Sequence, residues 1–328
     1  MGPFWRGRKR GGARVELPEW AWMFDDARKF HRFMDLVSGY FDGLGCEYDI
    51  DDGMVQSGDP GFNGMRMGLT NLAQTCLGMA ASEWPDAVRA HFECLRNTER
   101  EADAIERVKG DFSKVAPLLG VRLYPPEALG EMFETMVSRE DLPGLASVLC
   151  LNLPSSIRML RRDEADAWGV SDDELFMTAL TNLDSFTDAR VERVELPGGG
   201  SIWIVEGPSI FNASLVLRPE RLSAWLGRHG AFVSVPVRNC VFAAPFDGPE
   251  GTRHCAGVMQ ITASTANEGP GTICSSVWWT DGKRWIRIPY EIGRKGGITV
   301  MPPTEFNEIL ARLCETWKAE ERMKAPRS

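Results

Sequence analysis

The chain has 328 residues, of which 43% are hydrophobic and 25% charged, and its formal net charge is -9. This length corresponds to about two domains, and the composition is that of a folded globular protein, which excludes extensive disorder. The negative charge argues against broad binding to nucleic acids or anionic membranes, which attract basic surfaces. No apolar run approaches the roughly 18 residues that cross a bilayer, so we expect no membrane contact and a cytoplasmic location.

The first part of the chain is predicted to be helix-rich. We expect a flexible basic arm over residues 1–19, with nucleic-acid contact through this arm as an alternative, and a helical domain over residues 20–115. The apolar spacing predicts helices from Asp25 to Leu44, from about Met65 to Met79, and from about Ser82 onward. An Asp-Gly pair within residues 46–56 predicts a hairpin, and a Pro-Pro break places the domain boundary near residues 110–125.

The second part, residues 120–314, is predicted to be an α+β domain, followed by a charged tail over residues 315–328. A continuous apolar run predicts a central strand at 145–153, and Ser171 with Glu174 predicts a capped helix start. A further helix is expected at 219–230, and further strands are expected at 189–196, 201–207, 231–245, 257–264, 272–279 and 284–290. Helices followed by successive strands favour the α+β class, with a mostly antiparallel sheet and helices on one face.

The four-residue motif LTNL occurs twice, at residues 69–72 and 180–183. A repeat this short is weak evidence for a duplicated unit. In both copies we expect the leucines to face inward, and we expect Asn71 and Asn182 to bind backbone groups of a neighbouring loop or strand end, because asparagine amides compete for such groups.

Residues 275–289 contain three tryptophans around an Asp-Gly pair, which predicts a two-residue hairpin turn that sets Trp278 opposite Trp285. Because side chains alternate across a strand, Val277 and Trp279 are expected to face the core. Paired tryptophans can simply stabilise a hairpin, or they can form a contact surface, since tryptophan and arginine are enriched at binding hot spots. The candidate partner-binding residues on the second face are Trp278, Lys283, Trp285 and Arg287.

Sequence motifs for catalysis are weak. The four histidines lack metal-ligand spacing, and there is no nucleophile elbow or phosphate-binding glycine loop, so we predict no cofactor. The glycine-rich residues 196–201 are interpreted as a hairpin loop. His254 and Cys255 are adjacent and would point to opposite faces of a strand. The alternative is a hydrolase or transferase whose site assembles around Arg238, His254 and Cys255.

Four segments, at 172–183, 211–226, 232–245 and 275–288, occur in an order that resembles the YtpQ-type bacterial family, a domain of unknown function. The resemblance covers roughly residues 140–290, rests on packing and turn patterns, and implies no reaction, cofactor or catalytic residue. The family pattern places Arg-Asp where this chain has Arg238 and Asn239, so acid-dependent chemistry at that point is not carried over. The chain also resembles small secretion-chaperone-like α+β folds. We therefore expect a non-enzymatic module, of adaptor, immunity or chaperone-like kind, that binds a protein partner.

Overall fold

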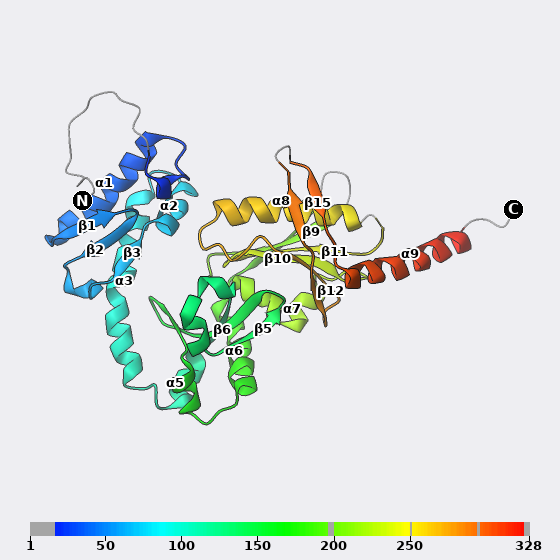
Figure 1. The fold of residues 1–328 in the computed structure, drawn as a ribbon. Helices are drawn as coiled ribbons and strands as arrows, with labels where there is room; N and C mark the ends of the chain where they lie inside the picture. The colour runs from blue at the N-terminus through cyan, green and yellow to red at the C-terminus, as the bar shows by residue number, and fades with distance from the viewer. Residues whose placement is uncertain (1–16, 196–199, 250, 294–295, 325–328) are drawn as a thin grey trace. The chain divides into compact units, whose positions relative to one another are not determined.

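The computed structural model describes residues 17–195, 200–249, 251–293 and 296–324 (Figure 1). Its helices and antiparallel sheets confirm the α+β class. The chain forms two compact units, Met1–Arg96 and Asn97–Ser328, so the division lies inside a helix rather than near residues 110–125. The charged stretch before the expected boundary continues this helix without a break, and Ile105 near its end is buried in a core of the second unit.

The first unit has a small sheet and an aromatic core. Helix α1 begins after Asp26, whose carboxylate accepts the backbone N–H of Arg28, and ends at Gly45 in the left-handed conformation. The helix expected from about Met65 begins later, at Thr70, because residues 66–68 form strand β3 and pair with β2. The elements are α1 (Ala27–Leu44), β1 (Tyr48–Asp51), β2 (Met54–Ser57), β3 (Arg66–Gly68), α2 (Thr70–Leu77) and α3 (Trp84–Glu106). The hairpin expected at 46–56 is confirmed as β1 and β2.

The second unit begins with a four-stranded antiparallel sheet. Strand β6 is central, since β4, β5 and β7 all pair with it, which confirms the strand expected at 145–153. Helix α6 packs on β4 and begins after its N-cap residue Ser171, whose hydroxyl accepts the backbone N–H of Glu174 at 3.3 Å. The elements are α4 (Phe112–Val115), β4 (Leu119–Tyr124), β5 (Ser138–Leu142), β6 (Leu145–Asn152), β7 (Ile157–Met159), α5 (Arg162–Asp166) and α6 (Asp172–Phe186).

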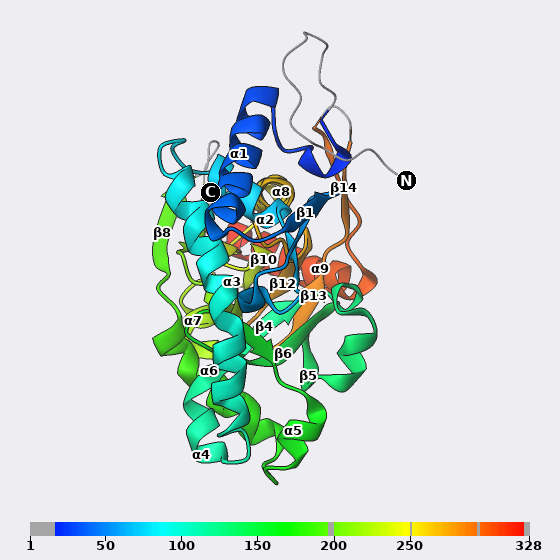
Figure 2. The ribbon, with the colours of Figure 1, turned by 90° about the vertical axis from the view of Figure 1, so that its left-hand side faces the viewer.

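A six-stranded antiparallel sheet follows, in the order β13-β12-β10-β11-β9-β8, with β8 at one edge (Figure 2). Helix α8 covers one face of this sheet (Figure 1). The other face packs in a core shared with leucines of β4, β5 and β6. The elements are β8 (Arg190–Glu195), β9 (Ser201–Glu206), α7 (Pro219–Ser223), β10 (Ala231–Val237), β11 (Cys240–Pro245), α8 (Gly251–Glu268), β12 (Val277–Thr280), β13 (Trp285–Arg287), β14 (Tyr290–Ile292), β15 (Ile298–Val300) and α9 (Thr304–Lys324).

Three expectations for this region need correction. Residues 257–264 lie in α8 and not in a strand, so His254 and Cys255 are also helical. The segment 231–245 forms two strands, because the chain turns between β10 and β11. Helix α9 runs through residue 315, so no separate tail begins there. The basic arm over residues 1–16 and the glycine loop at 196–199 lie outside the described residues, although β8 and β9 on either side of that loop do pair.

The two LTNL copies occupy different settings. Leu69 and Leu183 are fully buried, in different units, and the first copy opens α2 whereas the second lies late in α6. The amide of Asn182 donates to the carbonyl oxygens of Ala116 at 2.7 Å and Leu119 at 2.9 Å, which confirms the expected link to a strand end. The side chain of Asn71 is exposed. The repeat therefore marks no duplicated structural unit.

Candidate partner-binding site

The tryptophan hairpin has a longer loop than expected. Thr280 pairs with Trp285 and Trp278 with Arg287, so four residues, 281–284, connect the strands. The carboxylate of Asp281 explains this loop, because it accepts the backbone N–H groups of Lys283 at 3.0 Å and Arg284 at 2.9 Å. The pairing is displaced by two residues, an even number, so each side chain keeps the face that the sequence predicted.

The second face of the hairpin does not form an aromatic surface. Trp278 is 1% exposed, and its indole N–H donates to the carbonyl oxygen of Pro143 at 3.0 Å. Trp285 is half-buried against the same core. The expectation that Trp278 contacts a partner is wrong, because the sheet of β4, β5 and β6 covers it. Lys283 and Arg287 are both exposed, but of these two side chains Arg287 alone lines the groove described next.

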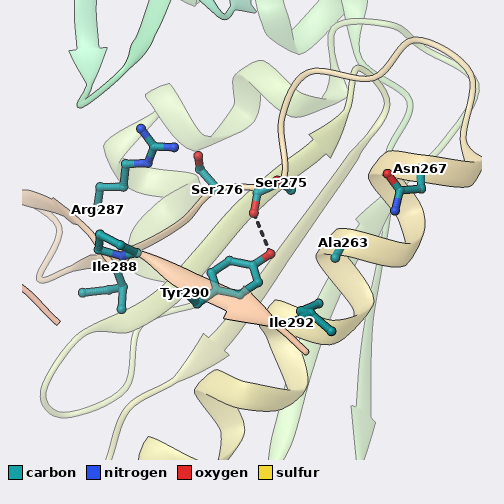
Figure 3. Close-up of a pocket in the computed structure, with 9 residues that line it drawn as sticks. Ala263, Asn267, Ser275, Ser276, Arg287, Ile288, Tyr290 and Ile292 are labelled. Carbon is teal, nitrogen blue, oxygen red and sulfur yellow. Dashed lines mark hydrogen bonds between the residues drawn. The ribbon is translucent and has the colours of Figure 1, made fainter. Parts of the chain in front are cut away.

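Arg287 lines an open groove with a volume of about 600 Å³ (Figure 3). The guanidinium of Arg287 and the side chain of Ser276 lie at one end of the groove, and Asn267 of α8 lies at the other. The apolar part of the lining comes from α8, from β14 and from the two residues between β13 and β14, with Ile292 42% exposed. The lining residues are Ala263, Asn267, Ser275, Ser276, Arg287, Ile288, Pro289, Tyr290 and Ile292.

Tyr290 fixes the walls of the groove to one another. Its hydroxyl lies 2.7 Å from the carbonyl oxygen of Ser275, before β12 (Figure 3). The same hydroxyl lies 3.2 Å from the carbonyl oxygen of Met259 in α8. Burial raises the pKa of Tyr290 to about 12, so the hydroxyl keeps its proton at neutral pH and can donate to these carbonyl groups. The groove is therefore a preformed feature that links a helix and two strand segments.

The charge in the groove is a single exposed cation. Across the described part of the chain, no carboxylate forms an ion pair with the guanidinium of Arg287. Ser276 and Asn267 add a hydroxyl and an amide to the same lining. A guanidinium binds a carboxylate through two parallel hydrogen bonds, and the apolar side chains of the lining offer contact area beside it. The groove therefore suits an extended segment that carries one acidic side chain.

The structure does not bring the alternative catalytic residues together. Arg238 lies in the turn between β10 and β11, where its Nε donates to the carbonyl oxygen of Gly271, just beyond the C-terminal end of α8. Cys255 lies near the N-terminal end of α8, and a rise of about 1.5 Å per residue places it about 20 Å from Glu268 at the other end. Burial raises the pKa of the Cys255 thiol to about 12, which makes it a poor nucleophile.

The groove was only partly predictable. Arg287 was assigned to the contact surface from the hairpin pattern, whereas Tyr290 of β14 and Asn267 of α8 come from segments whose proximity to the hairpin no local motif encodes. Within the described residues, no group of three histidine, cysteine or acidic side chains could hold a metal ion, and no helix is both long and apolar enough to span a bilayer. We found no matching family model, curated protein or solved structure, so the resemblance to the YtpQ-type family stays an expectation.

Proposed function

We propose that this chain is a non-enzymatic protein-binding module, of adaptor, immunity or chaperone-like kind, that binds an extended acidic segment of a partner protein in the Arg287 groove. The observation that supports this most strongly is the guanidinium of Arg287, which forms no ion pair with any residue that the structure describes and lines a preformed groove of about 600 Å³. This volume is within the range of known ligand-binding pockets. A cytoplasmic setting and a bacterial origin are part of the same proposal.

The proposed contact combines one charged anchor with apolar walls. A partner carboxylate would accept hydrogen bonds from Arg287, while Ser276 supplies a hydroxyl beside it. The neighbouring partner side chains would cover Ile292, which is 42% exposed in the free chain. Charge selects the acidic residue, and the apolar wall supplies the contact area.

A peptide selection with defined charge variants tests this function. We expect the full chain to select, from a displayed peptide library, peptides that share one Asp or Glu beside apolar residues. In fluorescence anisotropy, Arg287→Glu should weaken binding of a selected peptide at least tenfold, since a lost charge-assisted contact of about 1.5–3 kcal/mol corresponds to that factor or more. The same variant should gain affinity for the peptide in which Lys replaces the acidic residue.

Lys283→Glu provides a matched control, because Lys283 is also exposed in the same hairpin but does not line the groove. It should change peptide affinity less than twofold at physiological salt, where separated surface charges are screened. Selection of no peptide, or equal losses for the two variants, would contradict the proposed function.

A further inference from the structure

Two arginines of the second unit, Arg122 of β4 and Arg238 of the turn after β10, occupy an interior setting unlike that of Arg287. Arg122 is only 5% exposed, and its guanidinium carbon lies 5.0 Å from the ring centre of Tyr124. Arg238 is partly buried, and its Nε donates to the carbonyl oxygen of Gly271. A side chain at Gly271 would overlap this guanidinium, so glycine allows the close packing.

Neither guanidinium has an acidic partner in the ranges that the structure covers. The Nη2 atom of Arg122 is buried and has no hydrogen-bond partner, and no ion pair involves Arg122 or Arg238. Burial, followed by the positive charge of Arg122, lowers the pKa of Arg238. The chain also brings the two segments together: the backbone N–H of Ala213 donates to the carbonyl oxygen of Arg238 at 3.0 Å, and the segment Asn212–Leu217 that contains Ala213 packs on β4, the strand of Arg122. The repulsion between the two cations agrees with this placement.

Buried and partly buried arginines without an acidic partner lower the stability of a folded chain unless a ligand compensates their charge. A buried charge is normally paired, because the lost hydration must be replaced by hydrogen bonds and an opposite charge. Two neighbouring cations without a carboxylate combine the desolvation cost with mutual repulsion. Stacking on Tyr124 replaces part of the lost hydration of Arg122 but supplies no negative charge.

We propose that Arg122 and Arg238 together bind a small oxyanion of the phosphate type. Two guanidinium groups are balanced by a ligand with close to two negative charges, which phosphate carries near neutral pH and a single carboxylate does not. Tyr124 holds the plane of the Arg122 guanidinium, and Gly271 engages Nε of Arg238, so the terminal nitrogens of both side chains are left to donate to the oxyanion. This site goes beyond the proposed function, because it uses none of the groove residues.

Calorimetric titration of the full chain with inorganic phosphate tests the site, with chloride used to keep the ionic strength constant. We expect one phosphate per chain, and Arg238→Gln should weaken the affinity at least tenfold. Arg190→Gln, which removes an exposed arginine from the edge strand β8, should leave the affinity unchanged. Acetate at the same ionic strength should bind at least tenfold more weakly than phosphate.

Thermal unfolding distinguishes an anion-binding role of Arg122 from a purely structural one, because the two roles predict opposite changes in the Tm of Arg122→Met. In phosphate-free buffer, Arg122→Met should raise the Tm because it removes an uncompensated buried charge, and phosphate should no longer raise the Tm of this variant. A lower Tm for Arg122→Met in that buffer would overturn the proposal. So would absence of phosphate binding by the unaltered chain, undiminished binding by Arg238→Gln, or equal affinity for acetate.

Discussion

At the scale of single residues, Asn182 joins α6 to the chain that enters β4. Its amide makes two hydrogen bonds to carbonyl oxygens, and Asn182→Ala would leave both of these groups without that donor. We expect the variant to lose about 1–3 kcal/mol of unfolding free energy, measured by urea denaturation. Asn71→Ala changes the matching residue of the other LTNL copy, which is exposed, and should cost less. Equal losses for the two variants would show that the two hydrogen bonds of the Asn182 amide do not determine the effect.

Cysteine reactivity gives a second prediction at this scale. Cys255 is 4% exposed and burial raises its pKa to about 12, whereas Cys314 of α9 is exposed. The thiolate is the reactive form, so the native chain should react with iodoacetamide at Cys314 at least tenfold faster than at Cys255, and raising the pH from 7 to 9 should not expose Cys255. Mass spectrometry of the labelled peptides measures both rates. Rapid labelling of Cys255 would contradict this prediction and would indicate that Cys255 can act as a nucleophile.

At the scale of secondary-structure elements, the tryptophan hairpin shows which features the sequence encodes locally. The alternation of side chains identified the faces correctly, because a displacement of two residues leaves the faces unchanged. The loop length was not predictable from the Asp-Gly pair alone. A two-residue turn was expected, but the carboxylate of Asp281 caps two further N–H groups and stabilises a four-residue loop.

Asp281→Ala should therefore destabilise this hairpin. We expect a loss of about 1–2 kcal/mol at pH 7, since the carboxylate accepts two backbone hydrogen bonds. Although burial raises the pKa of Asp281, its hydrogen bonds and its ion pair with Arg284 lower it overall, below 3.8. The carboxylate thus stabilises the fold above that pH, and its contribution is lost as the pH falls through the lower folded-state pKa.

Chemical denaturation across a pH series measures this contribution. The difference in unfolding free energy between the unaltered chain and Asp281→Ala should be largest near pH 7 and should shrink as the pH falls below 3.8. Lys283→Ala, a truncation of an exposed side chain in the same loop, is the control and should change the stability by less than about 0.5 kcal/mol. A difference that grows in acid would contradict the assigned role of Asp281.

Helix α8 shows how a local pattern can mislead. Residues 257–264 alternate enough to suggest a strand, but the side chains that the fold buries are Cys255, Val258, Met259, Thr262 and Ala266. Their separations of three and four residues are those of one helix face. The helical period extends over a longer window than the strand-like segment, so a longer window would have identified the helix. The correction matters for function, because it places Cys255 in the core that α8 shares with the sheet.

At the scale of the whole molecule, the fold class was predictable but the boundary between units was not. Runs of helical and strand periodicity determine the α+β class. The boundary depends on which core buries each turn of α3, and the sequence of that charged helix gives no sign of the change. The candidate site was predictable only at Arg287, because Tyr290 and Asn267 reach it through tertiary packing.

Separate cores predict a localised response to mutation. Phe41 is fully buried among aromatic side chains of the first unit, so Phe41→Ala should cost about 3–5 kcal/mol there. Hydrogen exchange followed by mass spectrometry should show lost protection in α1 and α3, while β10 and β12 of the second unit keep theirs. An equal loss of protection in all four elements would indicate that the whole chain unfolds as one cooperative body.

The central claim is that the Arg287 groove binds an acidic segment of another protein, and a crystal structure of the chain with a selected peptide tests it most directly. We predict that a carboxylate of the peptide lies about 2.7–2.9 Å from the guanidinium nitrogens of Arg287, with an apolar peptide side chain against Ile292. A peptide bound at another surface, with the groove occupied by solvent alone, would contradict the claim.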